Sequence, residues 1–66
     1  MIQPQVIKQI RKSKKCKREL QRVLDRSPAT IQRYLDTNDI MLTTSKALEV
    51  IRSEFKLSDK QILQSN

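Results

Sequence analysis

The sequence predicts an all-α fold, a compact bundle of five helices in a single domain that covers residues 1–66. Two observations lead to this prediction. The chain contains no glycine and two prolines, and strong helix formers occur along its whole length. Apolar residues recur at spacings of three and four, which is typical of helices with one buried face. A chain of this length forms one domain with a thin core.

The first two helices are predicted from apolar residues that fall on one side. The first helix begins near Pro4, because proline is tolerated in the first helical turn. Ile2, Val6, Ile7 and Ile10 then share one face, and the polar stretch of residues 12–15 ends or bends the helix. The second helix has an apolar side formed by Cys16, Leu20, Val23 and Leu24. Its opposite, polar side carries Lys17, Arg18, Gln21 and Arg22.

The third helix has the clearest start signal in the chain. The hydroxyl of Ser27 can accept from the free amides of the next turn, and Pro28 suits the first helical position. We expect the helix to run from Pro28 to about Asp36, with Ile31 and Leu35 on its inner face. Residues 37–39 then form a polar link.

Two further helices are expected in the second half of the chain. Thr43 and Thr44 offer N-caps for the fourth helix, and its apolar residues recur at three and four positions. Ser58 caps a short fifth helix, and Gln61 completes a capping box with it. The apolar residues assigned to these two helices are Leu48, Ile51, Phe55, Ile62 and Leu63.

Basic residues are concentrated in the first half of the chain. The whole chain has a formal net charge of +7. Residues 1–35 hold ten Lys or Arg against two acidic residues, a net charge of +8, whereas residues 36–66 hold four against five, a net charge of −1. This asymmetry predicts that the N-terminal half presents a surface to a polyanion.

The composition excludes several classes of function. Cys16 is the one cysteine, so it forms no internal disulfide and is interpreted as a small apolar residue. The chain has no histidine, and it offers neither a zinc ligand set nor groups arranged for acid–base or nucleophilic catalysis. We therefore expect no enzyme activity, no cofactor, no metal and no small-molecule ligand. No apolar stretch reaches the length of a signal peptide or a membrane span, so we expect a cytoplasmic protein without a membrane partner.

Residues 17–35 have the layout of a helix-turn-helix, two short helices joined by about three residues. Leu20, Leu24 and Ile31 lie at separations that can hold the two helices together. The turn needs a residue that tolerates a left-handed backbone, and Asp25 meets this need. In such a unit the second helix enters the major groove of DNA and the first lies across the backbone.

The second helix of this unit, residues 28–36, presents side chains that suit base edges. Glutamine pairs with adenine, arginine with guanine, and alanine contacts the thymine methyl group. The predicted base-reading residues are Ala29, Gln32 and Arg33, although Arg33 could equally hold a phosphate. Groups near the N-termini of both helices are predicted to hold the DNA backbone, namely Lys14, Lys15, Lys17, Arg18, Ser27 and Thr30.

Residues 27–35, SPATIQRYL, resemble the recognition helix of the lambda-repressor-like family of Cro and phage repressor domains. Residues 42–55 and 57–63 resemble the fourth and fifth helices of that bundle. The resemblance implies sequence-specific binding to double-stranded operator DNA as a homodimer. It also implies a nucleoid-associated transcriptional regulator, a repressor of phage or mobile-element type. The expected dimer surface is formed by the fourth and fifth helices, where the charge is nearly neutral.

Three residues depart from the family pattern where the two helices of the motif cross. Gln21 occupies a position where the family has a small residue, Asp25 one where it prefers glycine, and Arg26 one where it prefers an apolar side chain. Asp36 and Asp39, near the end of the recognition helix, would repel phosphate. These departures leave the docking angle on DNA open.

A second interpretation is a small helical protein–protein interaction module, an inhibitor or adaptor of a larger regulator that does not read DNA sequence. It predicts binding that is independent of charge and tolerance of substitutions at Gln32 and Arg33. An RNA-binding module fits less well, because such modules stack bases on exposed aromatic side chains. The aromatic residues here are Tyr34 and Phe55.

Overall fold

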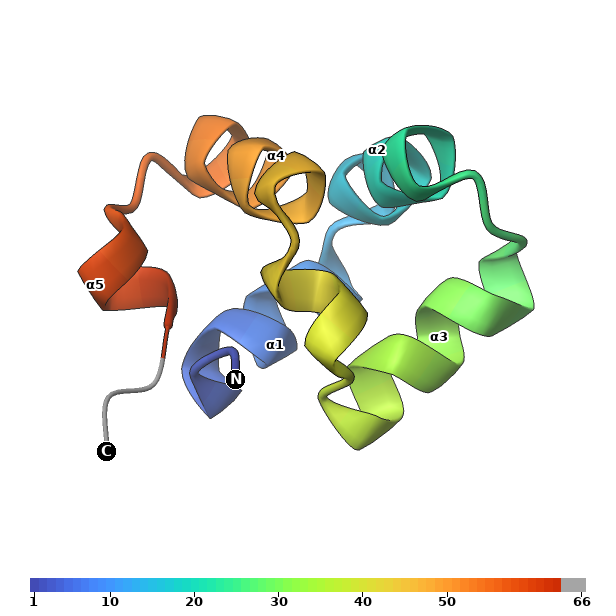
Figure 1. The fold of residues 1–66 in the computed structure, drawn as a ribbon, viewed down its shortest axis with the longest axis horizontal. Helices are drawn as coiled ribbons and strands as arrows, with labels where there is room; N and C mark the ends of the chain where they lie inside the picture. Colours follow the sequence, from blue (N-terminus) through green and yellow to red (C-terminus); the bar gives the residue numbers. More distant parts are fainter. Residues whose placement is uncertain (64–66) are drawn as a thin grey trace.

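The computed structural model describes residues 1–63 and contains five α-helices around one core (Figure 1). The helices are α1 (Pro4–Lys12), α2 (Lys14–Leu24), α3 (Pro28–Thr37), α4 (Ser45–Phe55) and α5 (Asp59–Ile62). A short 3₁₀ helix, η1 (Ile40–Thr43), lies between α3 and α4. Residues 1–63 contain no strand, only an isolated bridge between Ile2 and Leu63. The predicted all-α class with five helices is confirmed.

The helices enclose the core from all sides. α2 and α4 lie side by side and form the most extensive helix pair, while α3 lies below α2 and α5 below α4 in Figure 1. Helix α1 contacts both α2 and α3. The buried side chains are apolar and come from every helix: Ile2, Val6, Ile7, Ile10, Cys16, Leu20, Ile31, Leu35, Leu42, Ala47, Ile51 and Ile62.

A single residue, Ser13, separates α1 from α2. Its extended backbone (φ −102°, ψ 103°) ends α1, and its Oγ accepts from the Cys16 N–H at 3.1 Å to cap α2. The predicted interruption at residues 12–15 is therefore confirmed, and its physical cause is this cap. The cap itself was not predicted, although Ser13 lies three residues before the first buried residue of α2.

Three helices end in a residue with a left-handed backbone that is not glycine. Asp25 ends α2 with φ 53°, Asn38 ends α3 with φ 51°, and Lys56 ends α4 with φ 55°. Aspartate and asparagine adopt this conformation more readily than other side chains do. The left-handed turn predicted at Asp25 is confirmed, and it lets the chain reverse from α2 into α3 within three residues.

The N-terminal segment is held between the ends of α3 and α5. The Ile2 N–H donates to the Asn38 Oδ1 at 3.1 Å, and the Asn38 Nδ2 donates to the Ile2 carbonyl at 2.8 Å. On its other side, the Gln3 N–H donates to the Ile62 carbonyl at 2.8 Å. This short segment, in which Ile2 is fully buried, therefore joins the start of α1 to the ends of α3 and α5.

The caps predicted for the last two helices are found, with one refinement. Thr44 is the N-cap of α4 and accepts from the Ala47 N–H at 3.4 Å, whereas Thr43 lies in η1. Before α5, the Gln61 side chain accepts from the Ser58 N–H at 2.9 Å, as the predicted capping box requires. These caps fix the directions in which α4 and α5 leave the preceding loops.

Candidate nucleic-acid interface

An open groove of about 290 Å³ lies between α2 and α3. Three cationic side chains of α2 line it together with two glutamines, one from each helix. Among the described residues no carboxylate lines the groove, so the charges of its lining side chains are all positive. The lining residues are Lys14, Lys17, Arg18, Gln21, Pro28, Ile31 and Gln32.

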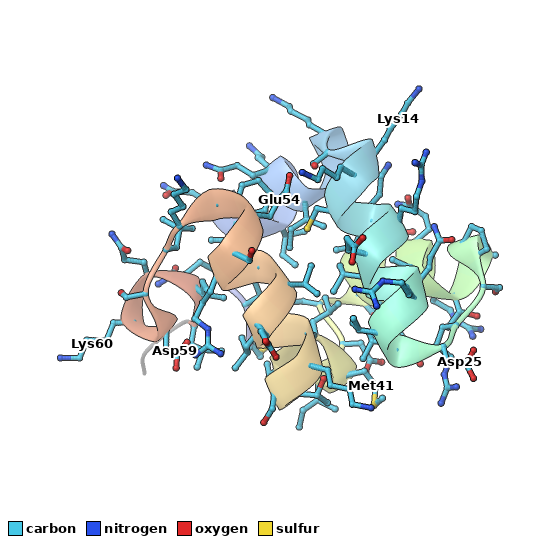
Figure 2. The ribbon with its side chains drawn as sticks, turned by 90° about the horizontal axis from the view of Figure 1, so that it is seen from above. Lys14, Asp25, Met41, Glu54, Asp59 and Lys60 are labelled. Atoms are coloured by element: carbon cyan, nitrogen blue, oxygen red, sulfur yellow. The ribbon has the colours of Figure 1, made fainter. Side chains whose placement is uncertain are left out.

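The local sequence of α2 explains why three cations share one flank. Lys14, Lys17 and Arg18 follow the three- and four-residue spacing that places side chains on one helix face. Cys16 and Leu20 occupy the buried face of the same helix. Lys14 projects into solvent at the N-terminal end of α2, which is the end where the helix dipole favours an anion (Figure 2).

The start of α3 presents hydroxyl groups beside this groove. The Ser27 Oγ accepts from the Thr30 N–H at 3.3 Å, and the Ser27 and Thr30 hydroxyls lie 3.0 Å apart. The predicted cap is therefore present. Because Ser27 uses the Thr30 N–H and Pro28 has none, the first turn of α3 offers an outside anion few amide donors.

The three predicted base-reading residues are all exposed on α3. Gln32 lines the groove, whereas Ala29 and Arg33 lie on the helix surface outside its lining. Their exposed positions, together with that of Pro28, make one accessible face from the first turn of α3 to its middle. The inner face of the same helix is buried through Ile31 and Leu35.

Among the lysines and arginines predicted to hold the DNA backbone, Lys15 is the one that does not line the groove. Its Nζ lies 4.0 Å from the Glu54 Oε2 of α4, on the flank of α2 that faces away from α3. That flank borders a second groove of about 640 Å³ between α2 and α4, which has charges of both signs and two valines. Its lining residues are Lys15, Glu19, Arg22, Val23, Lys46, Glu49, Val50, Ser53 and Glu54.

Gln21 and Arg26 both lie near the junction of α2 and α3. Gln21 is half-buried and lines the groove between the two helices. Arg26 lies at the outer edge of the turn, where its Nη1 donates to the Asp25 carbonyl at 3.1 Å and its Nε to the Tyr34 hydroxyl at 3.4 Å. The turn is thus supported by polar contacts in place of an apolar side chain.

The Asp36 carboxylate accepts hydrogen bonds from two side chains of the same chain. Its Oδ1 accepts from the Arg11 Nη2 of α1 and from the Gln32 Nε2 of α3, the latter at 3.1 Å. The sequence predicts that this carboxylate repels phosphate, and it gives no signal for the partner on α1. The four-residue spacing from Gln32 was the available signal for the second contact.

Cys16 lies outside the candidate interface and is fully buried. Desolvation, with smaller contributions from the negative charges of Glu54 and Glu19, raises the pKa of its thiol from 9.0 to about 12. The side chain is therefore a neutral thiol at physiological pH, and thiols of this kind are chemically inert. This agrees with its interpretation as a small apolar residue.

Metal sites and membrane spans are absent from the described part of the chain. Within residues 1–63 no group of three or more Cys, Asp or Glu side chains is arranged to hold a metal ion. None of the helices in this range has the length and apolar character needed to cross a bilayer. Comparison with family models, with curated proteins and with solved structures finds no match to the chain.

Proposed function

We propose that the protein binds double-stranded DNA with sequence specificity through a lambda-repressor-like helix-turn-helix formed by α2, the three-residue turn and α3. The observation that supports this most directly is the groove between α2 and α3, which combines three cations with two amides on one open surface. Cations hold phosphates without regard to sequence, whereas amides distinguish base edges. A DNA-reading surface needs both kinds of group.

In this proposal the exposed face of α3, residues 28–36, enters the major groove. Gln32 pairs with adenine, Ala29 contacts a thymine methyl group, and Arg33 contacts guanine or a phosphate. The DNA backbone is held chiefly by the groove cations of α2. The hydroxyls of Ser27 and Thr30 add neutral contacts at the start of α3, and Lys15 contributes from the far flank of α2 through its charge alone.

The biological role that follows is transcriptional regulation, as a repressor of phage or mobile-element type that acts in the cytoplasm on nucleoid DNA. We propose that it binds as a homodimer, because a two-fold dimer reads two half-sites and each module alone makes few base contacts. The proposed dimer surface is formed by α4 and α5. Residues 36–66 have a net charge of −1, so two copies repel one another less there than through their basic halves.

Selection from a random duplex library, with the full chain at a low and a high salt concentration, tests the proposal. We expect enrichment of a palindromic site that persists at high salt, with weaker binding to all sequences as salt rises. An enriched palindrome supports both the specificity and the dimer. Binding that enriches no site and disappears with salt would contradict sequence-specific recognition.

Failure of the selection would favour the second candidate, a small helical interaction module. The groove between α2 and α4 is the surface that favours this candidate, because it combines two half-buried valines with charges of both signs. Such a module tolerates alanine at Gln32 and Arg33. A Gln32→Ala/Arg33→Ala double variant would therefore separate the two candidates. It should lose sequence-specific DNA binding under the first and keep binding to a partner protein under the second.

A further inference from the structure

The side-chain amide of Gln32 is the one proposed base-reading group that has a specific partner within the described part of the protein. Its Nε2 donates to the Asp36 Oδ1 at 3.1 Å, one helical turn further along α3. The same oxygen accepts from the Arg11 guanidinium of α1. Arg11 and Asp36 are both about half exposed, so the three side chains form a surface network that connects α1 to the middle of α3.

The chemistry of this network fixes which way the amide faces. An ionised carboxylate has acceptors only, so the amide nitrogen of Gln32 must face Asp36 and the amide oxygen must face elsewhere. A reversed amide would bring two oxygens together and lose the hydrogen bond. The Arg11 guanidinium donates to this same oxygen of Asp36, which restricts the rotation of the carboxylate.

We propose that Asp36 is a positioning residue that makes Gln32 selective for adenine over guanine. With one N–H donated to Asp36, the amide retains one donor and one acceptor for a base. Adenine presents the complementary pair in the major groove, its N7 acceptor and its N6 amino donor, whereas guanine presents two acceptors, N7 and O6. The held amide oxygen therefore faces O6 unfavourably. This inference rests on the proposed function, since it concerns the DNA-reading face of α3.

Replacing Asp36 by asparagine keeps the shape of the side chain but removes the constraint on the orientation of the Gln32 amide. The substituted side chain still offers an oxygen to Arg11, but it also has an amino group that can donate to the Gln32 oxygen. The Gln32 amide can then adopt either orientation and turn its amino group toward guanine. Asp36 is exposed and belongs to no buried cluster, so we expect the D36N variant to fold like the wild type.

The experiment measures base preference at each position of the selected site for the wild type, D36N, Q32A and the double variant. Q32A identifies the position that Gln32 contacts. We expect D36N to lower the adenine-to-guanine preference there by about fivefold or more, to leave other positions unchanged, and to have no effect on that preference when Q32A is present. Weaker repulsion of phosphate should raise affinity equally on every sequence, and this uniform rise does not alter the ratio.

Two results would overturn the inference, and both differ from failure of the proposed function. The first is a D36N variant that binds more tightly but keeps the wild-type preference at every position. The second comes from NMR of the free protein. The proposal predicts that the Gln32 side-chain amide protons exchange with water more slowly than those of Gln5, an exposed glutamine of α1. Equal exchange would show that the amide is not held. By contrast, a wild type that enriches no DNA site contradicts the proposed function itself.

Discussion

Individual side chains of this protein have different roles according to the groups that surround them. Gln21 and Gln32 are both glutamines at the groove between α2 and α3, yet Gln21 is half-buried and Gln32 is exposed and held by Asp36. Cys16 lies on the buried face of α2 and is a neutral thiol. The partners of a side chain, more than its type, therefore decide whether it contributes to packing or to recognition.

The first residue-scale prediction concerns Gln32. We expect Gln32→Ala to weaken binding to the selected site by about 1–3 kcal/mol and to relax the preference at one base position. Titrations with the selected duplex and with point-substituted duplexes would measure this effect. Gln9→Ala, an exposed glutamine on α1, is the matched control and should change neither quantity. An equal loss on every sequence would remove Gln32 from the base-reading residues.

The second residue-scale prediction concerns the Cys16 thiol. Its pKa is about 12 in the folded chain against a usual value of 9.0, so the folded state disfavours the thiolate. The raised pKa therefore leaves the free energy of unfolding unchanged below pH 9.0. The free energy of unfolding then falls as the pH rises from 9.0 toward 12. A thiol-alkylating reagent should react slowly with native protein at mildly alkaline pH and rapidly in concentrated guanidinium chloride. Rapid alkylation under native conditions would contradict the burial of this side chain.

At the scale of elements, the directions of the helices are set by a few residues at helix ends. Ser13, Ser27 and Thr44 cap α2, α3 and α4 through their side-chain oxygens. Each replacement of such a cap by alanine typically costs about 1 kcal/mol. The opposite ends of α2, α3 and α4 need left-handed residues, and the chain supplies them without glycine.

Lys56 offers the clearest test of these helix ends. Lysine has no side-chain contact with its own backbone that favours φ 55°, whereas glycine adopts this conformation without steric cost. We expect Lys56→Gly to stabilise the domain by up to about 1 kcal/mol in urea unfolding. Ser53→Gly, at an exposed position inside α4, is the control and should destabilise it by about 0.5 kcal/mol. Destabilisation by both changes to the same extent would argue against the left-handed end of α4.

At the scale of the whole molecule, stability depends on a core to which residues 1–63 contribute twelve buried apolar side chains, and on the N-terminal segment that joins distant helices. A domain of this size has a total free energy of unfolding of roughly 3–10 kcal/mol. Loss of one large buried side chain is therefore comparable with the whole stability. The electrostatic field is also a property of the whole molecule, because the net charge of +8 on residues 1–35 exceeds the contribution of any single lysine.

Ile2 tests how much the N-terminal segment contributes. It is 0% exposed, and we expect Ile2→Ala to lower the free energy of unfolding by about 2–5 kcal/mol, since the substitution leaves a cavity in the core. Ile40→Ala makes the same chemical change at a side chain that is 77% exposed, and should have little effect. Urea unfolding of both variants measures the difference. Similar midpoints for the two would show that residues 1–3 are not part of the folded core.

The salt dependence of DNA binding tests the charged flank of α2. Lys17 lines the groove, so Lys17→Ala should lower the slope of log affinity against log salt by about one unit. Lys60→Ala removes an exposed lysine of α5 and should leave the slope nearly unchanged (Figure 2). Lys15→Ala should lower the slope less than Lys17→Ala does, since Lys15 lies on the flank of α2 that faces away from α3. Equal slopes for wild type and Lys17→Ala would remove Lys17 from the phosphate contacts.

The sequence by itself determined the helices, because their signals are local. Apolar spacing, the Ser27-Pro28 start and the tolerance of Asp25 for a left-handed backbone depend only on neighbours within one or two turns. The same spacing placed Lys14, Lys17 and Arg18 on one flank of α2. The prediction that residues 17–35 form two helices with a short turn is confirmed for the same reason, while its use in DNA binding stays a proposal.

Only the tertiary structure decided which side chains meet across helices. Lys15 follows Lys14 directly in α2. The helical rotation between the two residues directs Lys15 toward Glu54 of α4 and away from the groove. Asn38 holds the backbone of Ile2, 36 residues earlier, and Arg11 of α1 reaches Asp36 of α3. Such pairs depend on the packing angles of helices around a shared core, which apolar spacing along the chain does not specify.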